Sequence, residues 1–216
     1  MKSPEYYGRP RREMQPHIPA AATRLLDIGC GAGAFAAGLR AAREQDGRKM
    51  EIWGVEMSPE AARLATEVMD RVLTGDFHQV EPELPRRHFD TVLLNDVLEH
   101  VIHPEEVLRR VRPLLAPGGV VVASIPNVRH FFNVVNLVVH GRWDYTEDGI
   151  LDRTHLRFFT RSSMKRMFQE NGYRVDRMVG INPTGSLKFK FVNVLTLGRW
   201  ADMQFLQFAV TAAPRD

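Results

Sequence analysis

The chain has 216 residues, of which 44% are hydrophobic and 25% are charged. A chain of this size buries about 70% of its unfolded surface, which predicts one domain and excludes a disordered, collagen-like or coiled-coil architecture. The single cysteine, Cys30, excludes an internal disulfide and fits a reducing compartment. No apolar run approaches the ~18 residues of a membrane span, and the N-terminus lacks the apolar core of an export signal, so we expect a cytoplasmic protein.

The net charge is +3, but the charges are unevenly distributed. Residues 150–200 contain ten Lys and Arg side chains against Asp152, Glu170 and Asp176, a local balance of +7, so the rest of the chain sums to −4. Such a segment indicates an acidic partner: a phosphorylated small molecule, a nucleic acid or an anionic lipid surface. A solvated surface rich in arginine is an equally good interpretation.

The first half of the chain alternates between expected strands and helices. Residues 1–22 contain four prolines and are expected to form an extended arm. Strands are expected at 24–28 and 51–56, with an Ala-rich helix over 35–43 between them. Ser58-Pro59-Glu60 is a strong helix start, because it combines an N-cap, a proline at the first position and an acid in the first turn; this helix should reach about Met69.

The alternation continues, which predicts βαβ units and a mainly parallel sheet. The expected elements are strands at 71–74, 89–94 and 120–124, a helix over 104–115, a loop-like region over 126–160, a helix over 161–171, and last strands at 173–179 and 205–211. The stretch 182–200 between those last strands is basic and aromatic.

A glycine loop follows the first expected strand. Gly29, Gly31 and Gly33 let the backbone turn tightly and approach a ligand, although the loop also fits the fingerprint of dinucleotide-binding oxidoreductases. Asp27 stands two residues before the first glycine, where a phosphate-binding loop gains nothing from a carboxylate. Glu56 ends the second strand and can accept from both hydroxyls of a ribose.

Residues 22–125 contain four motifs in a characteristic order: LLDIGCGAG, the acid of VEMS, the Gly75-Asp76 pair and LLAPGGVVVASIP. On the strength of these motifs, the segment resembles the class I S-adenosylmethionine-dependent methyltransferases. The resemblance implies a single α/β domain over 1–216. Its Rossmann-like sheet would have seven strands, mainly parallel with the last antiparallel, helices on both faces and a lid insertion after strand five. Segments 126–160 and 182–200 would lie on the acceptor side.

The resemblance also implies how S-adenosylmethionine would bind. Its methionine end would lie near Asp27 and Gly29, its ribose at Glu56 and its adenine near Asp76. The further expected cofactor contacts are Gly31, Gly33, Met57, Phe77 and Asn95, together with Tyr7 and Arg9 from an N-terminal arm that closes over the cofactor.

A second constellation follows the fourth strand. Asp96, Glu99 and His100 have the i, i+3, i+4 spacing that places side chains on one face of a helical turn. Two carboxylates and an imidazole that converge would repel unless a divalent metal joined them. In the alternative interpretation, Asp96 caps a helix, Glu99 faces solvent and His100 is a general base without a metal; His130 is a second candidate base.

Residues 149–161 resemble the segment that supplies a further histidine ligand in small-RNA 3′-terminal 2′-O-methyltransferases. This resemblance implies that His155 joins Asp96, Glu99 and His100 around one Mg²⁺ or Mn²⁺ ion. Quinone-type O-methyltransferases have a similar acid-x-x-Glu-His run. Asp96 is shorter than the glutamate usual at the first position of that run.

The motifs NDVLEH, SIPNVRHF, GRWDY and GILDRTHLRFFT resemble the methyltransferases among bacterial surface-polysaccharide enzymes, including those of O-antigens. They imply a sugar hydroxyl as acceptor, on a polysaccharide or on its lipid-linked or nucleotide-linked precursor. The alternative acceptors are an RNA ribose 2′-hydroxyl and a quinone-type small molecule. The RNA acceptor is disfavoured because the chain has no added RNA-binding module. A further alternative is a cofactor-binding regulator without activity.

Two apolar stretches, 131–139 and 187–200, fall outside the sheet pattern. They fit lids over the acceptor, a peripheral contact with the inner face of the membrane, or core packing and a homodimer contact. The sequence leaves these three readings open.

Overall fold

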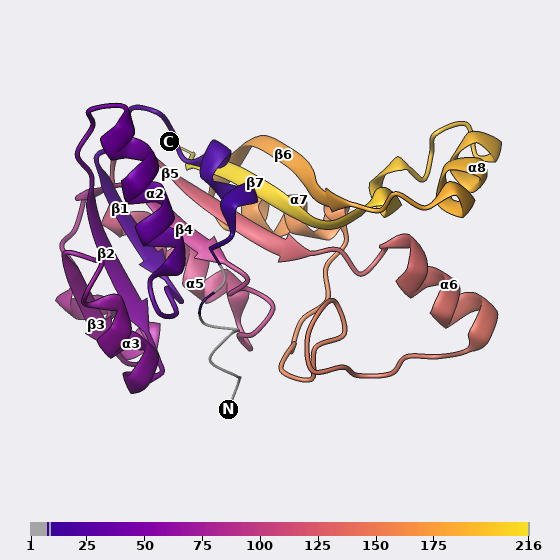
Figure 1. Ribbon diagram of the computed structural model, residues 1–216, viewed down its shortest axis with the longest axis horizontal. Helices are drawn as coiled ribbons and strands as arrows, with labels where there is room; N and C mark the ends of the chain where they lie inside the picture. The colour runs from indigo at the N-terminus through magenta and orange to yellow at the C-terminus, as the bar shows by residue number, and fades with distance from the viewer. Residues whose placement is uncertain (1–7, 9, 216) are drawn as a thin grey trace.

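The computed structural model describes residues 8 and 10–215, which form a central sheet with helices on both faces (Figure 1). Tyr7 and Arg9, which we expect to contact the cofactor, lie outside the described residues. None of the helices in the described part of the chain is both long and apolar enough to cross a bilayer.

The sheet has seven strands in the order β3-β2-β1-β4-β5-β7-β6. β7 pairs antiparallel with both of its neighbours, and the other pairings are parallel, which confirms the expected topology. The strands are β1 (Arg24–Ile28), β2 (Glu51–Glu56), β3 (Arg71–Thr74), β4 (Phe89–Asn95), β5 (Leu115–Pro126), β6 (Tyr173–Pro183) and β7 (Phe205–Pro214). The carboxyl ends of β1, β2 and β4 therefore meet at one edge, where α/β sheets bind ligands.

Helices connect these strands. They are α2 (Ala34–Gln45), α3 (Pro59–Ala65), α4 (Phe77–Val80), α5 (Pro104–Val111), α6 (Phe131–His140), α7 (Arg161–Glu170) and α8 (Leu187–Leu195), with short 3₁₀ helices η1 (Arg12–His17), η2 (Glu81–Glu83), η3 (Arg112–Leu114) and η4 (Ala201–Gln204). Ser58 caps α3 as expected, since its hydroxyl accepts from the Ala61 N–H. Thr160 and Ser163 cap α7 reciprocally.

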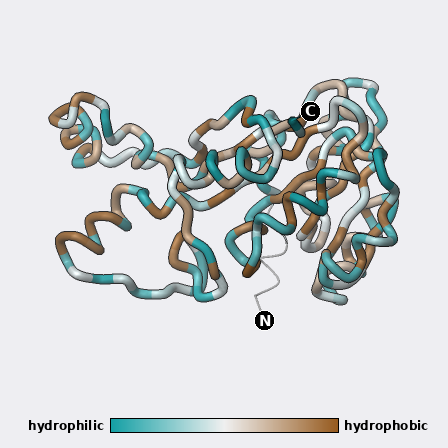
Figure 2. Tube along the Cα trace, turned by 180° about the vertical axis from the view of Figure 1, so that it is seen from behind, coloured by the Kyte–Doolittle hydropathy of each residue, from teal (hydrophilic) through white to brown (hydrophobic). Residues whose placement is uncertain are grey.

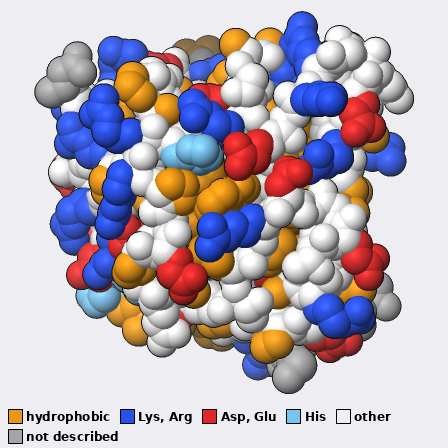
Figure 3. Space-filling model, turned by 90° about the vertical axis from the view of Figure 1, so that its left-hand side faces the viewer, with side chains coloured by type: hydrophobic (Ala, Val, Ile, Leu, Met, Phe, Trp, Pro, Cys, Tyr) orange, Lys and Arg blue, Asp and Glu red, His pale blue; other side chains and the backbone are white. Residues whose placement is uncertain are grey.

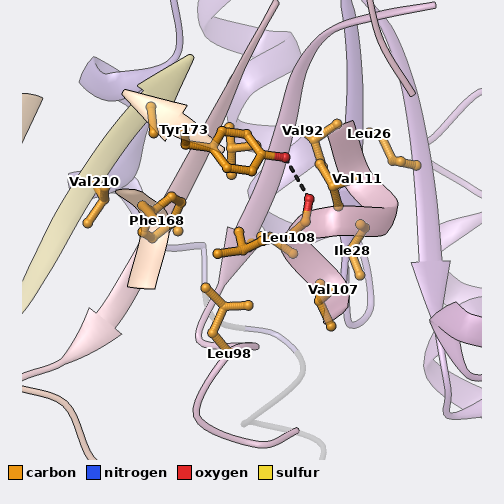
Figure 4. Close-up of a cluster of buried hydrophobic side chains, with 14 of the residues drawn as sticks. Leu26, Ile28, Val92, Leu98, Val107, Leu108, Val111, Phe168, Tyr173 and Val210 are labelled. Atoms are coloured by element: carbon orange, nitrogen blue, oxygen red, sulfur yellow. Dashed lines mark hydrogen bonds between the residues drawn. The ribbon is translucent and has the colours of Figure 1, made fainter. Parts of the chain in front are cut away.

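Two hydrophobic clusters hold the sheet between its helices. One lies under α5 and α7, where the buried Tyr173 hydroxyl donates a hydrogen bond of 2.7 Å to the Leu108 carbonyl (Figure 4). The other lies under α2 and includes Phe35 and Leu39. Met14 of η1 belongs to this second cluster, which joins the N-terminal segment to the core.

Several expected boundaries are wrong. The predicted extended arm fails over residues 12–17, because Met14 is fully buried and the segment coils into η1. α3 ends at Ala65 rather than near Met69, since the Asp70 N–H must reach the Ile52 carbonyl to start β3 beside β2. α5 ends at Val111 because Pro113 falls within the short helix η3 that follows it, and β5 begins five residues earlier than expected.

The loop-like prediction for 126–160 is wrong over 131–140, which form α6. Helices α6 and α8 project beyond the end of the sheet (Figure 1), and the tube is largely apolar along α6 (Figure 2). They share a third, small cluster of Phe131, Phe189 and Met203, separate from the two clusters of the sheet. The periodic signal is weak because seven of the ten side chains of α6 are apolar, on more than one face of the helix.

Candidate functional site

The glycine loop between β1 and α2 can be built only from glycine at two positions. Gly29 and Gly33 have φ of +77° and +80°, values that favour glycine. A Cβ at Gly33 would lie 2.5 Å from Cγ2 of Val68, and one at Gly29 would lie 2.9 Å from Cγ2 of Val97. The loop thus passes too close to Val68 and Val97 for a larger residue at either position.

Glu56 closes this loop from the neighbouring strand. Its two carboxylate oxygens accept from the N–H groups of Gly31 and Ser58, each at 2.8 Å. Each carboxylate oxygen can accept more than one hydrogen bond, so two ribose hydroxyls remain compatible with this geometry. Glu56 therefore both shapes the loop and offers the recognition that the sequence predicts.

Two buried acceptor oxygens beside the loop have no hydrogen-bond partner in the part of the chain that the structure describes. They are Oδ1 of Asp27, at the end of β1, and Oδ1 of Asn95, at the end of β4. Burial, and then the nearby carboxylate of Glu56, raise the pKa of Asp27 to about 8. A cationic amino group placed here would offset that desolvation, so the site fits the methionine end of S-adenosylmethionine.

The residues expected near the adenine lie further out along the same edge. Asp76 is exposed and caps α4, because its Oδ1 accepts from the His78 N–H at 2.8 Å. Phe77 is buried at the start of α4, whereas Met57 is 71% exposed at the end of β2. These positions follow β2, which is paired with β1, and β3, which is paired with β2 at the edge of the sheet.

A cavity of about 250 Å³ lies at the ends of β4, β5 and β6. Its lining includes Arg11, Asp96, Glu99, His100, Asp152 and His155. It therefore joins the N-terminal segment, the turn after β4 and the loop before α7. We refer to it as the acceptor cavity, because its lining begins at Asp96, directly after Asn95, which is one of the expected cofactor contacts.

Glu99, His100 and His155 come together in this cavity. One ligand atom from each lies within 4.8 Å of the others. Glu99 is 1% exposed, and neither of its carboxylate oxygens has a hydrogen-bond partner among the described residues. Burial raises the pKa of Glu99 to about 8, against the lowering effects of its own backbone N–H and of Arg11, and Asp152 raises it further. An isolated buried carboxylate is costly, and a divalent cation is one way to satisfy it.

The Nδ1 atoms of the two histidines face backbone carbonyls of the loop before α7. Nδ1 of His155 lies 2.9 Å from the Ile150 carbonyl oxygen, and Nδ1 of His100 lies 3.2 Å from the Thr154 carbonyl oxygen and 3.1 Å from the Thr154 hydroxyl. A protonated Nδ1 can donate to these carbonyls. In a neutral ring this leaves the lone pair on Nε2. The segment is anchored because the N–H groups of Leu156 and Arg157 donate to the Glu99 carbonyl.

Asp96 is not part of that group, and the predicted helical face is wrong. Asp96 has φ of +54° and residues 98–102 form turns and bends, so the chain changes direction where a helix was expected. Oδ1 of Asp96 accepts from the Ser124 hydroxyl at 2.9 Å and from Nε2 of Gln207 at 2.7 Å. Arg11 forms an ion pair with the other oxygen. These contacts occupy the side chain and keep it away from Glu99.

His130 has a different position from the one expected of a base. It precedes α6, is 9% exposed and is not among the residues that line the acceptor cavity; burial lowers its pKa.

Arg11 and Gln207, in contrast, line the cavity and were not predicted from the sequence. They lie 196 residues apart and no local motif joins them, whereas Asp152 lies in the polar segment that the sequence singled out.

Comparisons with known proteins identify the family of the chain. The model of a family described as a methyltransferase domain matches residues 4–177. A ubiquinone biosynthesis O-methyltransferase of Azoarcus is 26% identical over 210 residues, covering 89% of this chain and 80% of the relative. Another of the same name, from Bradyrhizobium diazoefficiens, is 28% identical over 191 residues, covering 86% and 70%.

Solved structures share the fold. A SAM-dependent methyltransferase from Archaeoglobus fulgidus superposes with a TM-score of 0.65 at 19% identity, covering 97% of this chain and 94% of that one. A magnesium protoporphyrin IX methyltransferase from Synechocystis with bound SAH gives 0.57 at 15% identity, covering 89% and 74%. Since the family model spans most of the chain, including the glycine loop and the turn after β4, this protein belongs to the methyltransferase-domain family and is an S-adenosylmethionine-dependent methyltransferase.

Proposed function

We propose that this enzyme is an O-methyltransferase for a small hydroxylated acceptor, assisted by a divalent ion at Glu99, His100 and His155. The observation that carries the proposal is a buried carboxylate that has no hydrogen-bond partner within residues 10–215 and lies beside two imidazoles in the acceptor cavity. The relatives named for ubiquinone biosynthesis favour the quinone-type acceptor. The polysaccharide acceptor implied by the sequence motifs has no such support among them.

The size of the cavity agrees with a small acceptor. About 250 Å³ is below the usual 300–1,000 Å³ of sites that enclose a drug-sized ligand. It can hold one ring with its hydroxyl groups, and a longer molecule would extend out of it. Ile150 and Leu206 supply apolar surface to the lining, and Arg11 with Asp96 supplies a polar wall.

The chemistry divides between the cofactor and the chain. When bound, S-adenosylmethionine supplies a methyl group on an already reactive sulfonium, and a divalent ion would supply Lewis acidity toward the acceptor hydroxyl. Asp27, Glu56 and Asn95 would orient the donor. One carboxylate and two imidazoles suit Mn²⁺ or a later transition metal at least as well as Mg²⁺. In the metal-free alternative, His100 takes the acceptor proton, since it is the least buried of the three.

The test is methyl transfer to a panel of catechols and of monosaccharide glycosides, before and after treatment with EDTA. We expect activity on catechols, loss in EDTA and recovery with Mn²⁺. His155→Ala should lose metal binding and turnover while S-adenosylhomocysteine binds as before. His140→Ala, at the exposed end of α6, serves as the control. Full activity of protein shown by elemental analysis to be metal-free would refute the metal site, and activity only on glycosides would restore the sugar acceptor.

A further inference from the structure

The described part of the chain gathers its exposed apolar side chains at one end. Of the fifteen large hydrophobic residues that are exposed, ten lie on α6 or in residues 187–200. They are Phe132, Leu137, Val138, Val139, Leu187, Phe191, Val194, Leu195, Leu197 and Trp200. We call these ten residues the α6–α8 surface. Contiguous apolar surface of this kind marks an interaction site.

The α6–α8 surface belongs to one unit rather than to two loose segments. Phe131 of α6 and Phe189 of α8 are buried against each other, with ring centroids 5.5 Å apart. The inner faces of both helices are thereby used, and their outer faces carry the exposed residues, such as Val138 at 75% and Val194 at 72%. Packing within the chain therefore leaves these outer faces uncovered.

The charges around this surface have one sign. Lys188, Lys190 and Arg199 lie within 187–200, and Arg142 follows α6; neither 131–142 nor 187–200 contains an acidic residue. The nearest acids in sequence are Asp144 and Asp202, and Asp202 forms an ion pair of 3.2 Å with Arg129. At the opposite end of the molecule, acidic and basic side chains are interspersed over the surface (Figure 3).

We infer that the α6–α8 surface docks the enzyme on an anionic membrane surface. Short helices with an exposed apolar face and flanking Lys and Arg lie in the interface of a bilayer, with their apolar side chains among the acyl chains. A second copy of the chain is a poorer occupant, since a symmetric contact would bring the same lysines and arginines together.

The position of the surface gives docking a consequence for the site. α6 follows β5 and α8 follows β6, and Pro126 and Asn182 near the ends of these strands line the acceptor cavity. Figure 1 shows α6 and α8 together beyond the same end of the sheet. A membrane bound at these two helices would therefore lie on the side of the molecule that carries the acceptor cavity. The inference does not depend on the identity of the acceptor or on the metal.

The test is co-sedimentation of the full chain with vesicles of phosphatidylcholine containing 30% phosphatidylglycerol, compared with pure phosphatidylcholine. We expect binding to the anionic vesicles that falls with salt. Replacing Lys188, Lys190 and Arg199 by Gln should weaken it on the order of 100-fold, since each basic residue near such a surface contributes about fivefold.

Val194→Asp with Leu195→Asp should abolish vesicle binding, and so should Val138→Asp with Val139→Asp. Leu64→Asp, an exposed apolar position on α3, is the matched control and should bind like the parent. Unchanged S-adenosylhomocysteine binding reports that each variant is folded. Absence of vesicle binding by the parent would overturn the proposal. If the parent is instead a dimer, and Val194→Asp with Leu195→Asp converts it to a monomer while neither protein binds vesicles, the proposal is also overturned and the surface is a contact between copies of the chain.

Discussion

Glu99 should make the metal-free protein less stable as the pH rises. Burial raises the pKa of this carboxyl from its ordinary 4.5 to about 8, so between these values the folded chain keeps a proton that the unfolded chain has lost. A group with a raised acidic pKa therefore costs stability in that window, and the cost grows with pH. At 1.36 kcal/mol per unit, it is below about 1 kcal/mol at pH 5 and about 3 kcal/mol at pH 7.

The perturbation is Glu99→Gln, which removes the titration and keeps the shape. The amide has its own burial cost, but that cost is the same at both pH values. The difference in unfolding free energy between variant and parent should thus shift in favour of the variant by about 2 kcal/mol from pH 5 to pH 7. Asp27, whose pKa is also raised, is present in both proteins and does not enter the difference.

The assay is urea denaturation in EDTA at the two pH values, followed by the same measurement with Mn²⁺. Glu81→Gln is the comparison, because Glu81 is equally buried but forms ion pairs with Arg86 at 2.5 Å and Arg110 at 3.2 Å, and its loss should destabilise. Mn²⁺ should stabilise the parent more than Glu99→Gln at pH 7. A difference between Glu99→Gln and parent that does not change with pH would refute the reasoning.

Two other substitutions test the donor site and the core. Glu56→Ala should weaken S-adenosylhomocysteine binding at least tenfold in calorimetry. The substitution removes the acceptor of the Gly31 and Ser58 N–H groups as well as the expected ribose contact. The control, Glu60→Ala on the exposed face of α3, should bind S-adenosylhomocysteine like the parent. Tyr173→Phe should cost about 1–2 kcal/mol in urea denaturation, because it leaves the buried Leu108 carbonyl without its 2.7 Å hydrogen bond, and an unchanged midpoint would contradict this account.

The sequence by itself determined the alternating strands and helices and the glycine loop, and it predicts the acids of the donor site. These features rest on local rules: alternating strands and helices, the glycines required at positive φ, and the Ser58-Pro59 helix start. Because parallel strands end at one edge, Asp27, Glu56 and Asn95 could be assigned to one site before any contact was known. The antiparallel last strand came from the family resemblance, and the structure agrees.

Only the tertiary structure decided which polar residues meet in the acceptor cavity. Asp96 and Glu99 are three residues apart and were expected on one helical face, but Gln207, 111 residues away, and Arg11 hold Asp96 in a separate network. The helices α6 and α8 were not predicted for a related reason. Their apolar residues do not recur with a clear helical period, and the positions of the two helices are set by the packing of Phe131 on Phe189. Spacing along the chain predicts backbone geometry, whereas partners far apart in sequence are chosen by packing and by the cost of leaving buried charges unpaired.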